Sequence, residues 1–306
     1  VKAVHFFTAG FSEIGKPEWQ ELEIIERFPH KQGSIRIIGP NSIGIYCPEH
    51  KIPLGASPKG EVGMSGSVSF ICQSGGIASK LTRIGLARCI NYSKGISFGN
   101  GIDLDASDFL QYLAADPKTM VIGAYLEGTR DGRRLFNTIK EVTRIKPLII
   151  WKGGRTEVGA EAAMSHTGSL ISSSAIWSAA IEQAGAVEVR SLEELSDSLL
   201  IFQQLGGWKG SNVAVVGGIG GGGGGISVSA SDACMESGLK IPPLSGKTRE
   251  ELVSLLGEVG SILRNPIDVS QSMFRDSLNL FKAIELVIQD TVIDLVLIQE
   301  DVDILS

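Results

Sequence analysis

The chain has 306 residues, a net charge of −6 and 43% hydrophobic residues. A chain of this length and hydrophobic content can bury more than one core, and its length suggests two domains or slightly more. The negative net charge and the absence of any run of lysines and arginines argue against a nucleic-acid partner, because such a surface needs clustered cations. No apolar run approaches the roughly 20 residues of a membrane-spanning helix, and no signal-peptide pattern opens the chain, so we expect a cytoplasmic protein without a membrane partner.

Glycine and cysteine usage narrow the class further. The 38 glycines, together with only 6% aromatic residues, suit an α/β protein with many tight turns between strands and helices. The four cysteines are spread along the chain without a CxxC pair, so neither a zinc site nor a disulfide framework is indicated. We therefore expect no metal site and four buried free thiols at Cys47, Cys72, Cys89 and Cys234.

The first two thirds of the chain alternate between strand-like and helical patterns. A strand-like run opens the chain at residues 1–7, and a helix is predicted over 17–28. A longer unit follows over residues 61–205. Its predicted strands are 67–72, 88–92, 121–126, 147–151 and 186–189, and its amphipathic helices include 106–115 and 133–144. This alternation predicts a parallel sheet with right-handed crossovers.

A second unit is predicted over residues 211–306, after a glycine-rich linker at 206–210. The strand–helix pattern restarts at 212–216, and a helix is expected over 226–237. Between them lie six consecutive glycines, 220–225. Alone they are typical of a flexible low-complexity loop. Their position between a strand and a helix is equally typical of a turn whose backbone approaches a phosphate, so both interpretations stay open. The predicted strand at 294–298 lies near the end of the sequence, where the strand–helix pattern still requires helices, so we expect further helices beyond this sequence.

The leading candidate for chemistry is His166, in a stretch of small residues after the strand at 147–151. This stretch should emerge at the carboxyl edge of a parallel sheet, where open α/β folds hold ligands. A neutral imidazole is a good nucleophile, and a carboxylate that accepts a hydrogen bond from one ring nitrogen leaves the other free to attack phosphorus. A structural or surface histidine is the alternative. His5, His30 and His50 lack such a loop.

Two other segments are predicted at the same edge. Gln73, Ser74, Gly75 and Gly76 follow a strand and open a helix, whose N–H groups and dipole favour an anion by roughly 0.3–1 kcal/mol. The alternative is that Ser74 is only the N-cap of that helix. Glu127 ends the strand at 121–126 and should lie beside His166, unless it is a solvated strand-end carboxylate.

Asp103 and Asp105 lie in a glycine-rich loop and could be mistaken for a metal pair. Because their spacing supplies no third ligand, we predict that they order the loop or cap a helix.

Six motifs occur in an order that resembles the NDP-forming (ADP-forming) acyl-CoA synthetases, relatives of the succinyl-CoA synthetase α subunit. The resemblance covers essentially the whole chain. It rests on Gly39-Pro40-Asn41-Ser42-Ile43-Gly44, Gln73-Ser74-Gly75-Gly76, Gly99-Asn100-Gly101-Ile102-Asp103, Ser165-His166-Thr167-Gly168, Asp232-Ala233-Cys234 and Asn265-Pro266-Ile267-Asp268.

The resemblance implies a fold and a site. Residues 1–55 would be the C-terminal part of a Rossmann-type CoA-binding domain, with Gly10, Phe11, Glu13 and Asn41 at the CoA or substrate site. Residues 61–205 and 211–306 would be two flavodoxin-like, doubly wound domains, the second truncated. His166 would carry the phosphoryl group on a mobile loop, and Glu127 would hydrogen-bond its ring. Two helix N-termini would hold the phosphate, one after Gln73–Gly76 and one after the turn that contains Gly220, Gly221 and Gly222.

The resemblance also implies an acid–thiol ligase that interconverts acyl-CoA, NDP and phosphate with carboxylic acid, CoA and NTP. CoA would bind this chain, and ATP or ADP with Mg²⁺ would bind a separate ATP-grasp domain or β subunit, for which the sequence shows no pattern. We expect an oligomer. The alternative is a non-catalytic, ligand-sensing module, like the synthetase-like portion of fused protein acetyltransferases.

Overall fold

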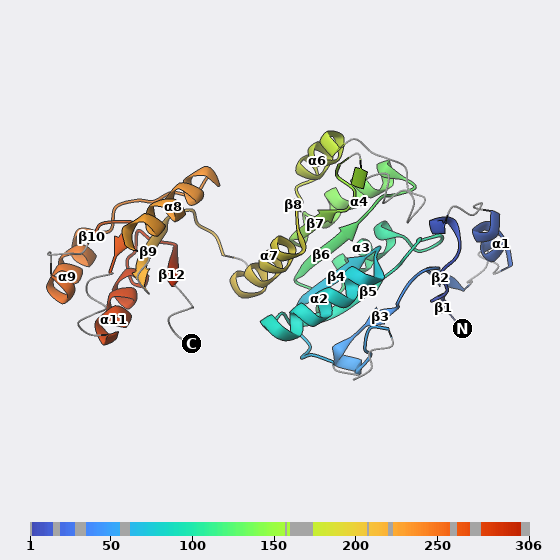
Figure 1. Ribbon diagram of the computed structural model, residues 1–306, viewed down its shortest axis with the longest axis horizontal. Helices are drawn as coiled ribbons and strands as arrows, with labels where there is room; N and C mark the ends of the chain where they lie inside the picture. Colours follow the sequence, from blue (N-terminus) through green and yellow to red (C-terminus); the bar gives the residue numbers. More distant parts are fainter. Residues whose placement is uncertain are drawn as a thin grey trace. The chain divides into compact units, whose positions relative to one another are not determined.

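The computed structural model describes residues 2–14, 19–27, 35–55, 62–156, 158–159, 174–206, 208–219, 223–257, 262–269 and 277–300. The chain folds as two compact units, Val1–Gly206 and Gly207–Ser306, both built from strands and helices (Figure 1). The predicted α/β class with parallel sheets is confirmed. The boundaries predicted for the three domains stay predictions. Within the described residues, no helix has the length and apolar character needed to cross a membrane.

The first unit opens with a small parallel pair, β1 (Ala3–His5) and β2 (Arg36–Ile38), with η1 (Ser12–Ile14) and α1 (Trp19–Arg27) between them in sequence. Asp103 anchors β2 to the rest of the unit. Its carboxylate accepts the N–H of Ile37 at 2.7 Å and pairs with the guanidinium of Arg36 at 3.0 Å. Asp105 caps the helix that follows. The predicted loop-ordering and capping roles of these two aspartates are confirmed.

A six-stranded sheet follows, in the order β3-β5-β4-β6-β7-β8, and only β3 is antiparallel to its neighbour. The strands are β3 (Ile45–Tyr46), β4 (Val68–Cys72), β5 (Tyr92–Ser97), β6 (Val121–Leu126), β7 (Leu148–Lys152) and β8 (Val187–Val189). Its helices are α2 (Gly75–Arg88), α3 (Ala106–Ala115), α4 (Gly132–Val142), α6 (Ser174–Gln183) and α7 (Leu192–Leu205), and η2 (Pro48–His50) follows β3.

Helices cover both faces of this sheet (Figure 1). Neighbouring residues of one strand point to opposite faces, so Ile122 packs with α3, α4 and α6 while Val121 packs with α2 and α7. Ile150 and Ile149 divide in the same way. Each fully buried side chain of this kind stabilises the fold by about 1.5–3 kcal/mol. Burial on both faces explains why the strands are almost continuously apolar.

One predicted strand of this unit is wrong, and the others lie within two residues of the observed ones. Residues 88–91 are not strand, because α2 continues to Arg88 and ends at Cys89 in the left-handed conformation, at φ 57°. The strand β5 begins only at Tyr92. Cys89 is exposed, contrary to the expected burial, whereas Cys47, Cys72 and Cys234 are buried, and all four thiols are free.

The second unit has a four-stranded sheet in the order β10-β11-β9-β12, in which only β10 and β11 are antiparallel. The strands are β9 (Val213–Ile219), β10 (Ile262–Leu263), β11 (Ile267–Asp268) and β12 (Leu295–Glu300), and the helices are α8 (Gly223–Glu236), α9 (Gly246–Leu256) and α11 (Ser277–Ile288). Val215 packs toward Cys234 of α8, and Ala214 packs toward the opposite cluster with Leu252 and Val287. The sheet is therefore also covered on both faces.

Candidate functional site

Three neighbouring strand ends bring polar side chains together at the carboxyl edge of the six-stranded sheet. β6 lies between β4 and β7 and is parallel to both. Cys72 of β4 pairs with Tyr125, and Leu126 pairs with Lys152. Gln73 and Glu127 come directly after their strands, and Lys152 is the last residue of β7. This is the edge at which open α/β sheets bind ligands.

The Gln73 side chain holds the turn that follows β6. Its amide oxygen accepts the N–H groups of Glu127 at 2.6 Å and of Gly128 at 3.1 Å. The Gln73 main-chain N–H donates to the carbonyl oxygen of Tyr125 at 3.0 Å. Gln73 is only 8% exposed, so this clamp is shielded from water. Its amide oxygen therefore fixes the backbone of Glu127, and its predicted contact with phosphate stays a prediction.

Lys152 fixes the same turn from the other side. Its ammonium donates to the carbonyl oxygen of Glu127 at 2.7 Å and to that of Gly153. It also lies 5.4 Å from the centre of the Trp177 ring, within the range of a cation–π contact. Lys152 is 6% exposed. Burial lowers the pKa of Lys152, while the Glu127 carboxylate opposes this effect. A buried lysine is costly without partners, and these contacts supply them.

The Glu127 side chain is half-buried. The Tyr125 hydroxyl is hydrogen-bonded to it, and burial and the carboxylate together raise the pKa of Tyr125. The Tyr125 ring packs edge-on against Trp151, with 4.6 Å between ring centres. At Gly153 an added Cβ would overlap the Tyr125 hydroxyl, so a larger residue there would displace the Tyr125 side chain. We call Gln73, Tyr125, Glu127 and Lys152 the Glu127 cluster.

The N-terminus of α2 begins at the same edge. Ser74 is its N-cap and accepts the N–H of Ile77 at 3.4 Å, so the capping role is confirmed. A Cβ at Gly75 would lie 2.7 Å from a side-chain carbon of Ile43, and glycine is therefore required for close packing. Gly76 is exposed. The binding of an anion by this helix end stays a prediction.

His166 lies outside the described residues, between Gly159 and the start of α6 at Ser174. Gly220, Gly221 and Gly222 also lie outside them. The described part of that turn shows a close approach between β9 and α8, because a Cβ at Gly217 would overlap the Ser227 hydroxyl. Ser227 is 2% exposed, and its hydroxyl meets no partner among the described residues.

The residues predicted for CoA gather around Asn100, for which the sequence indicated no role. The Glu13 carboxylate accepts the N–H groups of Gly10 and Phe11, the latter at 3.0 Å, and the Asn100 amide at 2.7 Å. Burial raises the pKa of Glu13, but these hydrogen bonds outweigh it and hold the pKa below its usual value. Asn41 adopts a φ of 57°, and its amide lies 3.5 Å from the side-chain oxygen of Asn100. A CoA contact for these residues stays a prediction.

Asn100 also connects this region to the turn after β6. Its amide donates to Glu21 at 2.8 Å, and Arg130 pairs with the other oxygen of Glu21 at 2.6 Å. The Glu21 side chain is 2% exposed. Arg130 lies three residues after Glu127, so these contacts tie the opening segment to the turn that follows β6. Among the described residues, no three His, Cys, Asp or Glu side chains are grouped as metal ligands would be.

Comparison with known proteins places this arrangement in context. A family model described as "Succinyl-CoA ligase like flavodoxin domain" matches residues 65–202, which contain the Glu127 cluster. The chain is 36% identical to the alpha subunit of an ADP-forming acetate–CoA ligase II of Pyrococcus furiosus, over 97% of this chain and 62% of that protein. It is 35% identical to an ADP-forming acetate–CoA ligase of Methanocaldococcus jannaschii, over 88% of this chain and 37% of that protein.

A solved structure is similar over the same extent. It is the dinucleotide-forming acetyl-coenzyme A synthetase 1 of Ca. Korarchaeum cryptofilum, in complex with phosphate and ADP. The TM-score is 0.84 with 30% sequence identity, over 97% of this chain and 62% of that chain. The chain thus spans less than two thirds of the length of each of these relatives.

Proposed function

The chain belongs to the NDP-forming acyl-CoA synthetases related to succinyl-CoA synthetase, and we propose that it carries the acyl-transfer and phosphohistidine steps of their reaction. The overall reaction is acyl-CoA + NDP + phosphate ⇌ carboxylic acid + CoA + NTP. A phosphate oxygen attacks the thioester carbonyl carbon, and the CoA thiolate leaves to give an acyl phosphate. A ring nitrogen of His166 then attacks phosphorus, and the carboxylate leaves. Covalent catalysis of this kind divides a difficult exchange into easier steps.

The observation that carries this proposal is the Glu127 cluster. A histidine nucleophile needs a fixed acceptor for its second ring N–H, which sets the tautomer and stabilises the charged ring. Glu127 suits that role, because the Tyr125 hydroxyl is hydrogen-bonded to its carboxylate and the side chains of Gln73 and Lys152 are hydrogen-bonded to its main chain. His166 follows β7 by fourteen residues, and β7 is the strand beside β6. Glu127 would thus orient the ring of His166.

Lys152 adds a positive charge that the sequence alone had not suggested for this site. Its ammonium donates to the main-chain oxygens of Glu127 and Gly153, and the nearby Glu127 carboxylate favours its charged form. We assign Lys152 the role of holding the Glu127 turn and offsetting the phosphoryl charge. The N-terminus of α2, with Ser74 and Gly76, would supply further N–H groups to the phosphate.

The remaining parts of the reaction belong to other segments. CoA would bind near Gly10, Phe11 and Asn41. ATP or ADP with Mg²⁺ would bind an ATP-grasp module, either elsewhere in a longer chain or on a partner subunit. The similarity to a protein named as an alpha subunit fits the second arrangement, and the similarity to a ligase named without subunits, of which this chain covers 37%, fits the first. None of the similar proteins described above is a ligand-sensing module, so we keep the catalytic interpretation.

The test is turnover by the complete assembly, the chain together with its ATP-grasp module. With acyl-CoA, ADP and phosphate supplied, we expect free CoA and ATP to form in equal amounts, and both to require phosphate. Release of CoA without ATP would indicate a thioesterase instead. Absence of turnover with any acyl-CoA tried would also contradict the proposal.

A further inference from the structure

His5 is the last residue of β1, and the loop that follows β2 holds its ring. The ring nitrogen Nε2 lies 2.9 Å from the carbonyl oxygen of Ser42 and 3.0 Å from the Ser42 hydroxyl. The ring also lies against Gly44, where an added Cβ would come within 3.4 Å of it. These contacts fix the ring relative to residues 39–44, although His5 is an exposed residue.

The hydrogen-bond partners decide which ring nitrogen of His5 carries the proton. The Ser42 carbonyl oxygen can only accept. The Ser42 hydroxyl donates its single hydrogen to the carbonyl oxygen of Ser97 at 2.6 Å, so it also acts as an acceptor toward His5. Nε2 must therefore carry a hydrogen, and Nδ1 of the neutral ring is left as an unprotonated acceptor. Within the part of the chain that the structure describes, Nδ1 has no hydrogen-bond partner.

The loop that holds His5 reaches the N-terminus of α2, at which we place the phosphate. Ser42 and Ile43 are both bonded to Ser97, the last residue of β5, whose hydroxyl accepts the N–H of Ile43 at 3.3 Å. The Ile43 side chain packs on Gly75, the first residue of α2, where a Cβ would lie 2.7 Å from it. One short loop therefore joins the His5 ring to the helix end.

The same loop also adjoins the segment at which we place CoA. Asn41 belongs to the loop, and its main-chain N–H donates to the carbonyl oxygen of Thr8 at 2.9 Å, two residues before Gly10. The sulfur of CoA has to meet the acyl phosphate between this segment and the N-terminus of α2. His5 lies beside the loop that connects the two.

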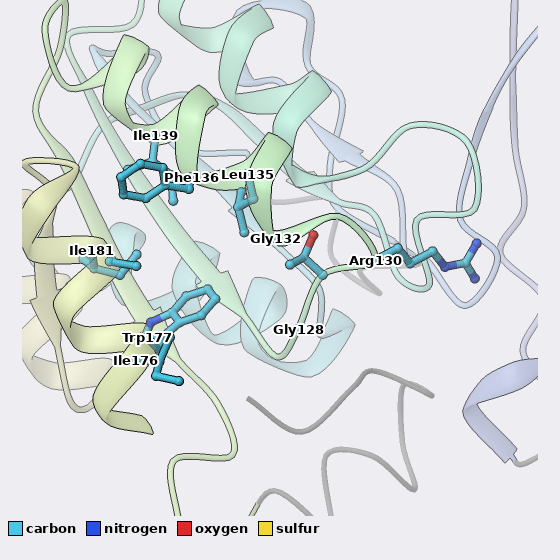
Figure 2. Close-up of a pocket in the computed structure, with 11 residues that line it drawn as sticks. Gly128, Arg130, Gly132, Leu135, Phe136, Ile139, Ile176, Trp177 and Ile181 are labelled. Carbon is cyan, nitrogen blue, oxygen red and sulfur yellow. The ribbon is translucent and has the colours of Figure 1, made fainter. Parts of the chain in front are cut away.

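The opening segment also reaches the turn that carries Glu127. Figure 2 shows the Arg130 side chain extending away from the apolar residues of a pocket beside that turn, and its guanidinium pairs with Glu21 of α1 at 2.6 Å. The opening segment is therefore attached both near the N-terminus of α2 and at the turn after β6. The His5 ring and the reacting phosphoryl group would thus belong to one site.

We infer that Nδ1 of His5 is the base that takes the proton of the CoA thiol during acyl transfer. This inference rests on the proposed function. In the direction of thioester synthesis, the S–H bond breaks and its proton goes to Nδ1, while the sulfur forms a bond to the carbonyl carbon of the acyl phosphate. The bond from that carbon to the phosphate oxygen breaks, and phosphate leaves with the electron pair. In the reverse direction, the imidazolium returns the proton to the leaving thiolate.

The acidity of the thiol sets how much such a base can contribute. A thiol with a pKa of about 8.5 is only about 3% thiolate at pH 7, and the thiolate is the nucleophile. A base that takes its proton therefore gains up to about 30-fold at pH 7 and little once the pH exceeds the pKa of the thiol. The charged groups beside His5 do not account for such a change, because β2 carries only Arg36, which is paired with Asp103, and residues 39–44 carry none.

His5→Gln tests the inference in the complete assembly, because the glutamine amide keeps a donor for Ser42 and removes the base. The first rate to measure is the formation of acyl phosphate from ATP and the acid without CoA, trapped by hydroxylamine. The second is acyl transfer from the same acyl phosphate to saturating CoA, at about pH 7 and about pH 9.5. We expect wild-type formation of acyl phosphate, transfer that is slower by about 10- to 30-fold at the lower pH, and transfer near the wild-type rate at the higher pH.

His50→Gln is the matched control, since His50 is exposed at the end of η2 and should not affect either rate. Wild-type transfer in His5→Gln at the lower pH would overturn the inference. A loss that persists at the higher pH, or a raised KM for CoA with unchanged transfer at saturation, would mean that His5 only holds the loop, and would also overturn it. Absence of both rates in the wild type would instead contradict the proposed function.

A second variant covers the case in which the glutamine disturbs the loop. His5→Ala should also lose transfer at the lower pH, and imidazole added to the solution should restore part of it by taking the place of the missing base. The same imidazole should not accelerate the wild type. No restoration in His5→Ala would overturn the inference.

Discussion

Replacing Lys152 with methionine removes a buried ammonium but keeps most of the length and apolar contact of the side chain. The carbonyl oxygens of Glu127 and Gly153 would each lose a charged donor. Each buried acceptor left without a donor costs about 1–3 kcal/mol. The variant no longer buries a charge, which offsets part of the cost of the two acceptors, so we expect the free energy of unfolding to fall by about 2–4 kcal/mol. For a unit of this size, that lowers the melting temperature by roughly 5–15 °C.

Lys146→Met is the matched control. Lys146 also donates to two main-chain oxygens, those of Leu113 at 2.8 Å and of Asp116 at 2.5 Å, and burial likewise lowers its pKa. It precedes β7, at the opposite edge of the sheet from the Glu127 cluster. Lys146 is less buried than Lys152, so the control should lose less stability, and it should not disturb Glu127.

The assay is turnover by the complete assembly at a temperature at which both variants are folded. A displacement of about 1 Å in a reacting group can cost on the order of 100-fold in rate, so Lys152→Met should lose about that much activity. Lys146→Met should retain wild-type turnover. Equal activity in the two variants would refute the idea that Lys152 positions Glu127, and an unchanged melting temperature in Lys152→Met would refute the contacts themselves.

Three further changes test other parts of the structure. Glu127→Gln removes the charge but keeps the size of the side chain, so turnover of the folded assembly should fall by about 10²- to 10⁴-fold, and unchanged kinetics would exclude an orienting role. Hydrogen bonds outweigh the burial of Glu13 and hold its pKa in the folded protein below the usual value of about 4.3. The ionised Glu13 carboxylate therefore stabilises the fold above that usual pKa, and this contribution is lost as the pH falls through the pKa of the folded protein. The wild type should accordingly lose more of its melting temperature than Glu13→Gln between about pH 6 and about pH 3, and parallel curves would contradict this. Gly217→Ala forces a methyl group onto Ser227 and should lower the free energy of unfolding by about 1–3 kcal/mol. Gly225→Ala meets open space on α8, so it should leave the free energy of unfolding unchanged or raise it by about 0.5–1 kcal/mol. Similar melting temperatures in the two variants would show that β9 and α8 are not in close contact.

The sequence was sufficient to predict most of the sheet that carries the site. Runs such as 121–126 and 147–151 are apolar because parallel strands bury both faces, and this signal does not depend on distant residues. The strand predicted at 88–92 was wrong for a local reason. The helix α2 ends there in a left-handed residue, and that conformation is usually marked by glycine, so a cysteine gave no signal for the helix end.

The contacts inside the site could be predicted only in part. Glu127 and Gln73 follow recognisable strands, so their shared edge was predictable. The clamp between them was not, because it depends on β4 and β6 being neighbours in the sheet. Lys152 was missed because the predicted strand ended one residue too early, at Trp151, and because no local pattern shows that the side chain reaches the Glu127 carbonyl. Asn100 was missed for the same reason, since its partners lie far away in sequence.

The central claim is that the edge of the sheet at Glu127 serves phosphoryl transfer through His166, and one labelling experiment tests it most directly. The complete assembly would be incubated with ATP labelled at the γ-phosphate and with Mg²⁺, and the label on this chain would be measured before and after acid treatment. We predict an acid-labile label that is absent in His166→Ala and reduced in Glu127→Gln. Undiminished label in His166→Ala, with the protein folded, would contradict the claim.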